Sequence, residues 1–145
     1  MAFQFTLQKV LELKEKDKLT REQEYAQAME TFEESATQLY HLLKQKEDIE
    51  KSLQDRIIKG ISIHELQRNE VTLMRLQTEI SRQEQSTNYA RDKMHSKQEA
   101  LVNVSMEVKK YEKVKELKEE QYNDEMKRLE SQFLDEISIQ QFASR

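Results

Sequence analysis

The chain has almost none of the residues that end helices or reverse the direction of the backbone. Among its 145 residues there is one glycine, Gly60, and no proline. Glycine and proline are the residues that most often terminate helices and form turns. The sequence therefore predicts two long helices with a single turn between them, at Gly60.

Other absences exclude classes of function. No cysteine is present, which excludes disulfides, thiol catalysis and zinc-thiolate sites. No apolar run approaches the roughly 20 residues that span a bilayer, and the N-terminus lacks the basic and apolar regions of a secretory signal. A formal charge of −4, with both signs interleaved, leaves no dense basic stripe for nucleic acid. We expect a cytoplasmic protein with no nucleic-acid partner and no direct membrane insertion.

The residues after Gly60 carry the signals of a new helix. Gly60 suits the left-handed conformation that closes a helix C-terminus. Ser62 and Glu65 have the spacing of a capping box, and Ile61 and Leu66 take the two positions of a hydrophobic staple. A kink within one continuous helix is the alternative, because a single glycine is tolerated inside helices. The combined signals favour a reversal of the chain.

Periodicity supports the reversal. Charged and apolar residues each make up 36% of the chain, and apolar residues recur at coiled-coil spacing. We call the row of side chains on each helix that faces the other helix its seam. On helix two the predicted seam is Leu66, Asn69, Leu73, Leu76, Ile80, Gln83, Thr87, Ala90 and Met94, continued by Leu101, Val104 and Val108. On helix one it is Ile57, Leu53, Ile49, Lys46, Leu43, Leu39, Ala36, Phe32 and Met29.

The two seams mirror each other about residue 61, which is the proposed corner. The fold is therefore predicted to be all-α: two long helices that form an antiparallel coiled-coil hairpin, with the corner at Gly60 and the second helix longer. We expect a single hairpin over residues 1–145, with helix one at about 3–59 and helix two at about 62–140. The stretch from Lys14 to Glu24 offers little apolar surface, so we expect the weakest packing there.

Helix two is predicted to extend past its partner beyond about residue 120 while keeping an apolar row at helical spacing. We call this row the apolar stripe; its members are Tyr122, Met126, Leu129, Phe133 and Ile137. An uncovered row of large apolar side chains indicates a binding partner. Self-association and a fold-back of the tail are the alternatives.

The sequence offers little for catalysis. His41, His64 and His95 are far apart and belong to no metal-binding motif. Carboxylates alternate with lysines along the helices, as expected for intrahelical ion pairs, and no glycine-rich loop is present to hold a phosphate. We expect neither an enzyme nor a bound cofactor or metal.

Four segments resemble the FliJ family of flagellar type III export proteins. They are Phe3-x-Phe5-x-Leu7-x-x-Val10-Leu11-x-Leu13-Lys14-Glu15, the turn Gly60-Ile61-Ser62-Ile63-His64-Glu65-Leu66, the segment Val108-Lys109-Lys110-Tyr111-Glu112-Lys113-Val114-Lys115-Glu116-Leu117, and Phe133-Leu134-Asp135-Glu136. The resemblance covers nearly the whole chain, and the order and spacing of the four segments are more specific than any one of them.

The resemblance implies a hairpin similar to the γ stalk of F-type ATPases, inserted in the pore of the hexameric export ATPase FliI. It also implies contact with the export-gate membrane protein FlhA, a place at the inner face of the cell membrane, and a link to export chaperones. The expected ATPase-ring contacts are Phe3, Phe5, Leu7, Tyr122, Met126, Leu129, Phe133 and Ile137. The expected gate contacts are Tyr40, Val71 and Met74, which lie outside the seams.

Three other roles compete with a flagellar stalk. A virulence injectisome uses a related stalk that the sequence separates poorly from a flagellar one. A general helical chaperone of the prefoldin kind needs β-hairpin segments for which the turn at Gly60 leaves no room. A dimeric coiled-coil adaptor would pair two chains in parallel, whereas we expect this chain to be a monomer.

Overall fold

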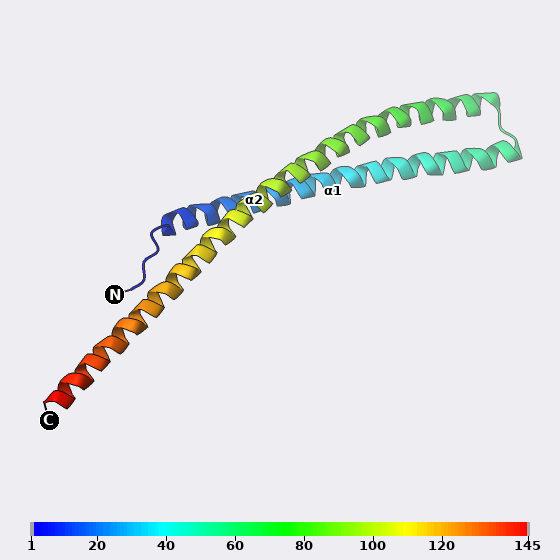
Figure 1. The fold of residues 1–145 in the computed structure, drawn as a ribbon. Coiled ribbons are helices and arrows are strands. Elements are labelled where there is room, and N and C mark those ends of the chain that lie inside the picture. Colours follow the sequence, from blue (N-terminus) through cyan, green and yellow to red (C-terminus); the bar gives the residue numbers. More distant parts are fainter. Residues whose placement is uncertain (1, 145) are drawn as a thin grey trace. The chain divides into compact units, whose positions relative to one another are not determined.

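A computed structural model describes residues 2–144 of the chain. These residues form two α-helices, α1 (Gln8–Lys59) and α2 (Ile63–Ala143), and no strand. The helices pack against each other in opposite directions (Figure 1). The predicted all-α antiparallel hairpin with a longer second helix is confirmed. α1 begins at Gln8, later than the expected start at about residue 3, and α2 ends at Ala143, close to the expected end at about residue 140.

The chain divides into two compact units, and each contains parts of both helices. Unit 1 joins the N-terminal residues up to Thr20 with the chain from Val102 onward. Unit 2 is Arg21–Leu101 and includes the turn. Within each unit an α1 segment pairs with an antiparallel α2 segment, so each buries its own part of the seam.

The turn has the backbone geometry that its sequence predicts. Gly60 has a φ of 97°, in the left-handed region, and its N–H donates to the Ile57 carbonyl at 3.3 Å, one of the two bonds of a Schellman motif. At the start of α2 the Glu65 N–H donates to Ser62 Oγ at 3.2 Å, as an N-cap requires. Gly60 therefore ends α1, and Ser62 caps α2.

Replacing Gly60 by alanine is expected to cost only about 1 kcal/mol of unfolding free energy. An added Cβ would meet no atom within 4 Å, so the cost comes from the backbone conformation alone. Denaturant unfolding followed by circular dichroism measures it. Gly60→Asn serves as the matched control, because asparagine tolerates positive φ better than alanine. A loss of several kcal/mol in Gly60→Ala would show that the turn depends on more than this backbone preference.

In unit 2 the α2 seam is the predicted one. Leu76, Ile80, Thr87 and Ala90 are buried, with Ile80 only 1% exposed, and the other predicted seam residues of α2 are at least half-buried. The contacts keep the predicted mirror about residue 61: Lys46 Nζ donates to Gln77 Oε1 at 2.7 Å. The pairing register follows from the sequence.

On α1 three of the predicted seam residues were wrong. Ile57, Leu43 and Met29 are exposed. Toward the N-terminus, the covered residues instead alternate in steps of four and three from Leu53, as a coiled coil requires. They are Leu53, Ile49, Lys46, Leu42, Leu39, Ser35, Phe32 and Ala28. The interface therefore covers Leu42 instead of Leu43, and Ala28 instead of Met29.

A buried polar cluster crosses the seam of unit 2. The hydroxyls of Ser35 and Thr87 lie 2.8 Å apart, and Gln83 Nε2 donates to Ser35 Oγ at 2.9 Å and to the Ser35 carbonyl at 3.0 Å. Thr87 is 2% exposed. Each of these polar groups is satisfied within the pair of helices, which avoids the cost of burying an unpaired hydroxyl.

Thr87→Val keeps the shape of the side chain but removes its hydroxyl, and is expected to lower the unfolding free energy by about 1–2 kcal/mol. The loss arises because the hydrogen bonds of the Thr87 hydroxyl with the hydroxyl and the carbonyl of Ser35 disappear inside a covered interface. Adding Ser35→Ala to Thr87→Val should cost less than the sum of the two single losses, since the Ser35 hydroxyl has already lost Thr87 as a partner. A double-mutant cycle measured by denaturant unfolding gives this coupling, and additive losses would contradict it.

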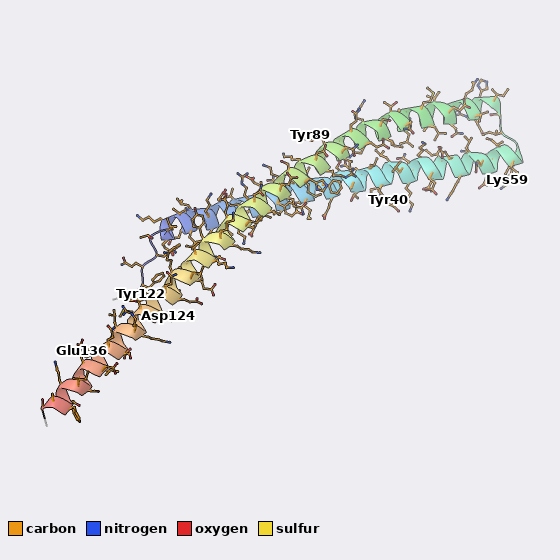
Figure 2. The ribbon with its side chains drawn as sticks, viewed as in Figure 1. Tyr40, Lys59, Tyr89, Tyr122, Asp124 and Glu136 are labelled. Carbon is orange, nitrogen blue, oxygen red and sulfur yellow. The ribbon has the colours of Figure 1, made fainter. Side chains whose placement is uncertain are left out.

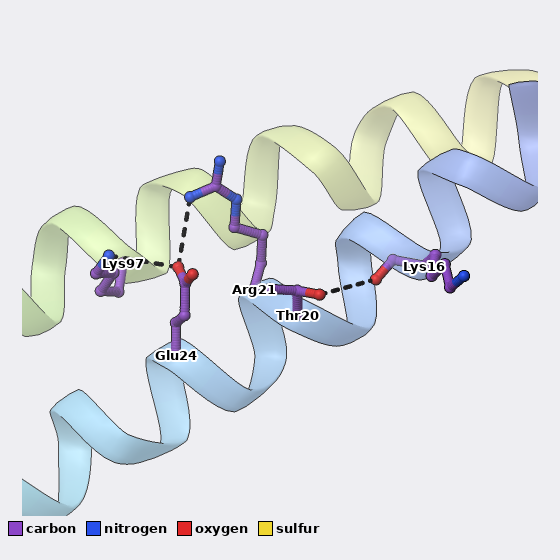
Figure 3. A network of polar contacts seen from close by, with 5 residues as sticks. All are labelled: Lys16, Thr20, Arg21, Glu24 and Lys97. Atoms are coloured by element: carbon purple, nitrogen blue, oxygen red, sulfur yellow. Dashed lines mark hydrogen bonds and ion pairs between the residues drawn. The ribbon is translucent and has the colours of Figure 1, made fainter.

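The charged stretch from Lys14 to Glu24 was predicted to pack weakly. Between Leu11 and Ala28 the described chain has no buried side chain. Ion pairs between the helices occupy it instead. In unit 1, Lys14 Nζ lies 2.6 Å from Glu107 Oε2, and this hydrogen bond lowers the pKa of Glu107 below its ordinary value. In unit 2, the Glu24 carboxylate accepts from Lys97 at 3.3 Å (Figure 3).

Candidate protein-binding surfaces

The last part of α2 carries large apolar side chains that the chain itself does not cover. Within the apolar stripe, Met126, Leu129 and Phe133 are 43%, 47% and 61% exposed, and Ile137 is half-buried. Figure 2 shows this part of α2, in orange and red, with Tyr122, Asp124 and Glu136 labelled. The structure thus places the predicted stripe on α2 as a largely open apolar surface.

Three further apolar side chains on this part of α2 were missed by the sequence analysis. They are Leu134, Ile139 and Phe142, all exposed. They fall outside the row at helical spacing on which the prediction rested. The signal that finds them is the high apolar content of both sides of the helix near its end, which a search along a single row passes over.

The N-terminal residues before α1 pack on α2 without forming a helix. The rings of Phe3 and Tyr122 have centroids 5.6 Å apart and are tilted by 48°, a favourable aromatic geometry. Phe5 is half-buried, whereas Leu7 is 40% exposed. Of the predicted ATPase-ring contacts, the structure therefore brings Phe3 and Tyr122 together and leaves the middle of the apolar stripe open.

An ion pair lies on the polar face of this part of α2. Arg128 donates from two nitrogens to the carboxylate of Glu125, one turn earlier. These charged hydrogen bonds lower the pKa of Glu125 and raise that of Arg128.

The residues predicted to contact the export gate are exposed in unit 2. Tyr40, Val71 and Met74 are 58%, 65% and 72% exposed. Tyr40 shares a shallow hollow of about 220 Å³ with Leu43, and Val71 lines a different one beside Thr72. The structure keeps all three side chains available to a partner but does not gather them in one pocket.

The described residues contain no group of histidine, aspartate or glutamate side chains that could hold a metal ion. Between residues 2 and 144, no helix is long and apolar enough to cross a membrane. The features that stand out chemically are the exposed apolar surfaces on a charged coiled coil, and surfaces of this kind commonly mark interaction sites for proteins or membranes.

The fold and these surfaces define a class: antiparallel coiled-coil proteins with uncovered apolar surface on the longer helix. A family model described as the flagellar FliJ protein matches residues 3–145. The flagellar FliJ protein of Bacillus subtilis strain 168 is 35% identical over 142 residues, covering 98% of this chain and 97% of that protein. No solved structure matches.

The chain belongs to the FliJ family of flagellar type III export proteins. The resemblance found in four segments of the sequence is thereby confirmed. Membership associates the chain with flagellum biogenesis, flagellar protein export and motility.

Proposed function

We propose that the chain is a non-enzymatic central stalk of the flagellar export apparatus, which binds the hexameric export ATPase and promotes both ATP turnover and substrate export. The observation that carries the proposal is the exposed apolar stripe on α2, in a chain that belongs to a flagellar export family. Residues Met126, Leu129 and Phe133 form its centre. Phe3 packs on Tyr122 at the start of the stripe, and Phe5 and Leu7 are proposed as further ring contacts.

The mechanism is one of binding. A single stalk in a ring of six subunits cannot match the symmetry of the ring, so its apolar stripe contacts only some subunits at a time. Burying one large apolar side chain contributes roughly 1.5–3 kcal/mol, so a few such contacts suffice to favour one arrangement of the ring. Turnover then rises because the stalk binds the ring states of the cycle with different affinities, as any population shift requires.

The proposed contact with the gate, a FlhA-like membrane protein, is formed by Tyr40, Val71 and Met74 of unit 2. In this arrangement the stalk links the ATPase ring to the gate and associates peripherally with the inner face of the membrane through the export apparatus. Export chaperones are further candidate partners. The exposure of Tyr40, Val71 and Met74 supports this assignment, because none of them takes part in the seam.

Alanine at Tyr40, Val71 and Met74 together is expected to weaken binding to the cytoplasmic region of the gate by at least about tenfold. The unfolding free energy should change little, because exposed side chains contribute little to the fold. Calorimetric titration with the purified gate region measures the affinity. Alanine at the exposed Tyr89 and Leu13 is the matched control, and equal affinity of both variants and the unaltered chain would place the gate contact elsewhere.

The direct test of the stalk role is ATP turnover by the purified export ATPase with and without the purified chain. We expect co-purification of the chain with the ATPase hexamer and faster turnover. Light scattering on the chain alone should give the mass of a monomer. A dimer with no effect on turnover would favour a coiled-coil adaptor, and binding of unfolded proteins in place of the ATPase would favour a general chaperone.

A further inference from the structure

The turn between the helices has an unusual composition. Residues 56–64, which we call the tip, read Arg-Ile-Ile-Lys-Gly-Ile-Ser-Ile-His and contain four isoleucines, two permanent cations and no carboxylate. The chain as a whole has more acidic than basic residues. Figure 2 labels Lys59 at the end of α1, beside the turn. The tip is thus a basic and apolar segment in an acidic protein.

Three isoleucines of the tip are exposed to solvent. Ile58 is 84% exposed and Ile63 is 72% exposed, and Ile57 is half exposed at 50%. Among the described residues no large apolar side chain is more exposed than Ile58. The tip therefore presents three branched apolar side chains to solvent.

The fold explains some tip residues and not others. Arg56 and Lys59 lie in the last turn of α1, where cations are favourable beside the helix dipole. Ile61 is half-buried at the staple position next to the N-cap. Neither capping nor packing accounts for Ile58 and Ile63, since both lie outside the seam and are mostly exposed to solvent.

We propose that the tip is a peripheral membrane-contact site that recognises the surface of an anionic lipid bilayer. Protruding branched apolar side chains suit shallow insertion at the level of the headgroups, and neighbouring cations suit anionic lipids. A bilayer surface can contact a protruding segment. Because residues 56–64 contain two cations and no carboxylate, the charged side chains within the tip attract an anionic surface and none repels it. The nearest carboxylates, Asp55 and Glu65, lie just outside the tip.

The contact is superficial and reversible. No helix of the described chain can cross a membrane. The sequence led us to expect no direct insertion because it has no apolar run long enough to span a bilayer. Three isoleucines reaching the interfacial region do not need such a segment. Each cation near an anionic surface strengthens binding about fivefold, so the tip alone predicts weak binding that depends on anionic lipid and falls with salt.

The proposal goes beyond the export role, because affinity of the purified chain for lipid needs no other export component. The test is co-sedimentation of the full-length chain with vesicles of phosphatidylcholine alone or with about 30% phosphatidylglycerol, a headgroup charge typical of cytoplasmic leaflets. We expect sedimentation with the anionic vesicles, at least about fivefold less with the neutral ones, and a marked loss near 0.5 M salt, where charge interactions are screened.

Two variants and one matched control assign the binding to the tip. Ile58→Asp with Ile63→Asp should reduce sedimentation with anionic vesicles by roughly tenfold or more, and Arg56→Ser with Lys59→Ser should reduce it severalfold. Leu13→Asp with Leu19→Asp makes the same charge change at two exposed apolar residues outside the tip, which are 67% and 60% exposed, and should sediment like the unaltered chain. Helicity measured by circular dichroism checks that every variant folds.

A labelled variant adds a local readout, since the chain has no native cysteine. Ile58→Cys carrying an environment-sensitive fluorophore should shift to the blue with anionic vesicles, and the same label on Tyr89→Cys, at a side chain that is 72% exposed, should not. Equal sedimentation with neutral and anionic vesicles, unchanged binding by Ile58→Asp with Ile63→Asp, or no lipid binding at all would each overturn the proposal. None of these outcomes affects the ATPase assay, so the two proposals fail separately.

Discussion

Aspartate at Leu129 and Phe133 is expected to abolish stimulation of the export ATPase while the chain keeps its helical content. Both side chains lie in the open centre of the apolar stripe, at 47% and 61% exposure. Loss of two large apolar contacts at roughly 1.5–3 kcal/mol each weakens binding to the ring by at least about 100-fold. Turnover of the purified ATPase at increasing chain concentration measures the effect.

A control with the same charge change is available in the same turns of α2. Ser131→Asp with Gln132→Asp places two aspartates at exposed polar residues, so any effect of added charge alone appears there too. Stimulation should survive in this control. If both double variants stimulate equally well, the apolar stripe is not the ring contact; if both lose stimulation, charge and not apolar burial governs it.

Ile80→Ala is expected to lower the unfolding free energy by about 2–5 kcal/mol, more than Gly60→Ala or Thr87→Val. Ile80 is 1% exposed at the centre of the unit 2 seam, and the space left by its side chain lies between two helices with little other core to close it. A long helix that loses its partner is only marginally stable in water. Denaturant unfolding followed by circular dichroism measures the loss.

Met74→Ala is the matched control for Ile80→Ala, because it removes a large apolar side chain that is 72% exposed on the same helix. It should change the unfolding free energy by less than about 0.5 kcal/mol. Comparable losses in the two variants would mean that the seam is not the main source of stability in unit 2.

The turn and the register were the parts of the fold that the sequence determined best. A single glycine followed by Ser62 and Glu65 leaves few ways to end one helix and begin another, and the structure has the left-handed Gly60 and the capped α2. The mirror about residue 61 held because a coiled-coil seam repeats strictly and its centre is fixed by the turn.

The errors on α1 have a common physical origin. The prediction chose Leu43 over Leu42 and Met29 over Ala28, although steps of four and three from Leu53 lead to Leu42 and Ala28. Ala36, which it also chose, is half-buried beside the buried Ser35. The interface is decided by heptad spacing and by the opposite helix, where the hydroxyl of Thr87 accommodates Ser35. A buried serine with a partner across the interface cannot be recognised from one helix alone.

The start of α1 was missed for a related reason. Phe3, Phe5 and Leu7 have a spacing that a helix or an extended segment can share, and the local sequence does not separate the two. The segment stays out of the helix, and its Phe3 ring packs on Tyr122 of α2 instead. Such a contact between residues distant in sequence decides the local conformation, so propensity alone could not predict it.

The candidate surfaces could be predicted only where they follow the helical periodicity of apolar residues. The apolar stripe continues the helical periodicity of α2, so its members could be named from the sequence, whereas Leu134, Ile139 and Phe142 lie off that row. The exposure of Ile58 and Ile63 at the tip depends on how the turn projects its side chains, and the sequence analysis assigned neither of them a role.

The central claim is that one chain serves one ATPase ring as a stalk. Titration of the chain into a fixed concentration of the export ATPase hexamer, with ATP turnover as the readout, tests it most directly. A central stalk predicts that turnover rises and reaches its plateau at one chain per hexamer. A plateau at one chain per ATPase subunit, or no rise in turnover at any ratio, would contradict the account.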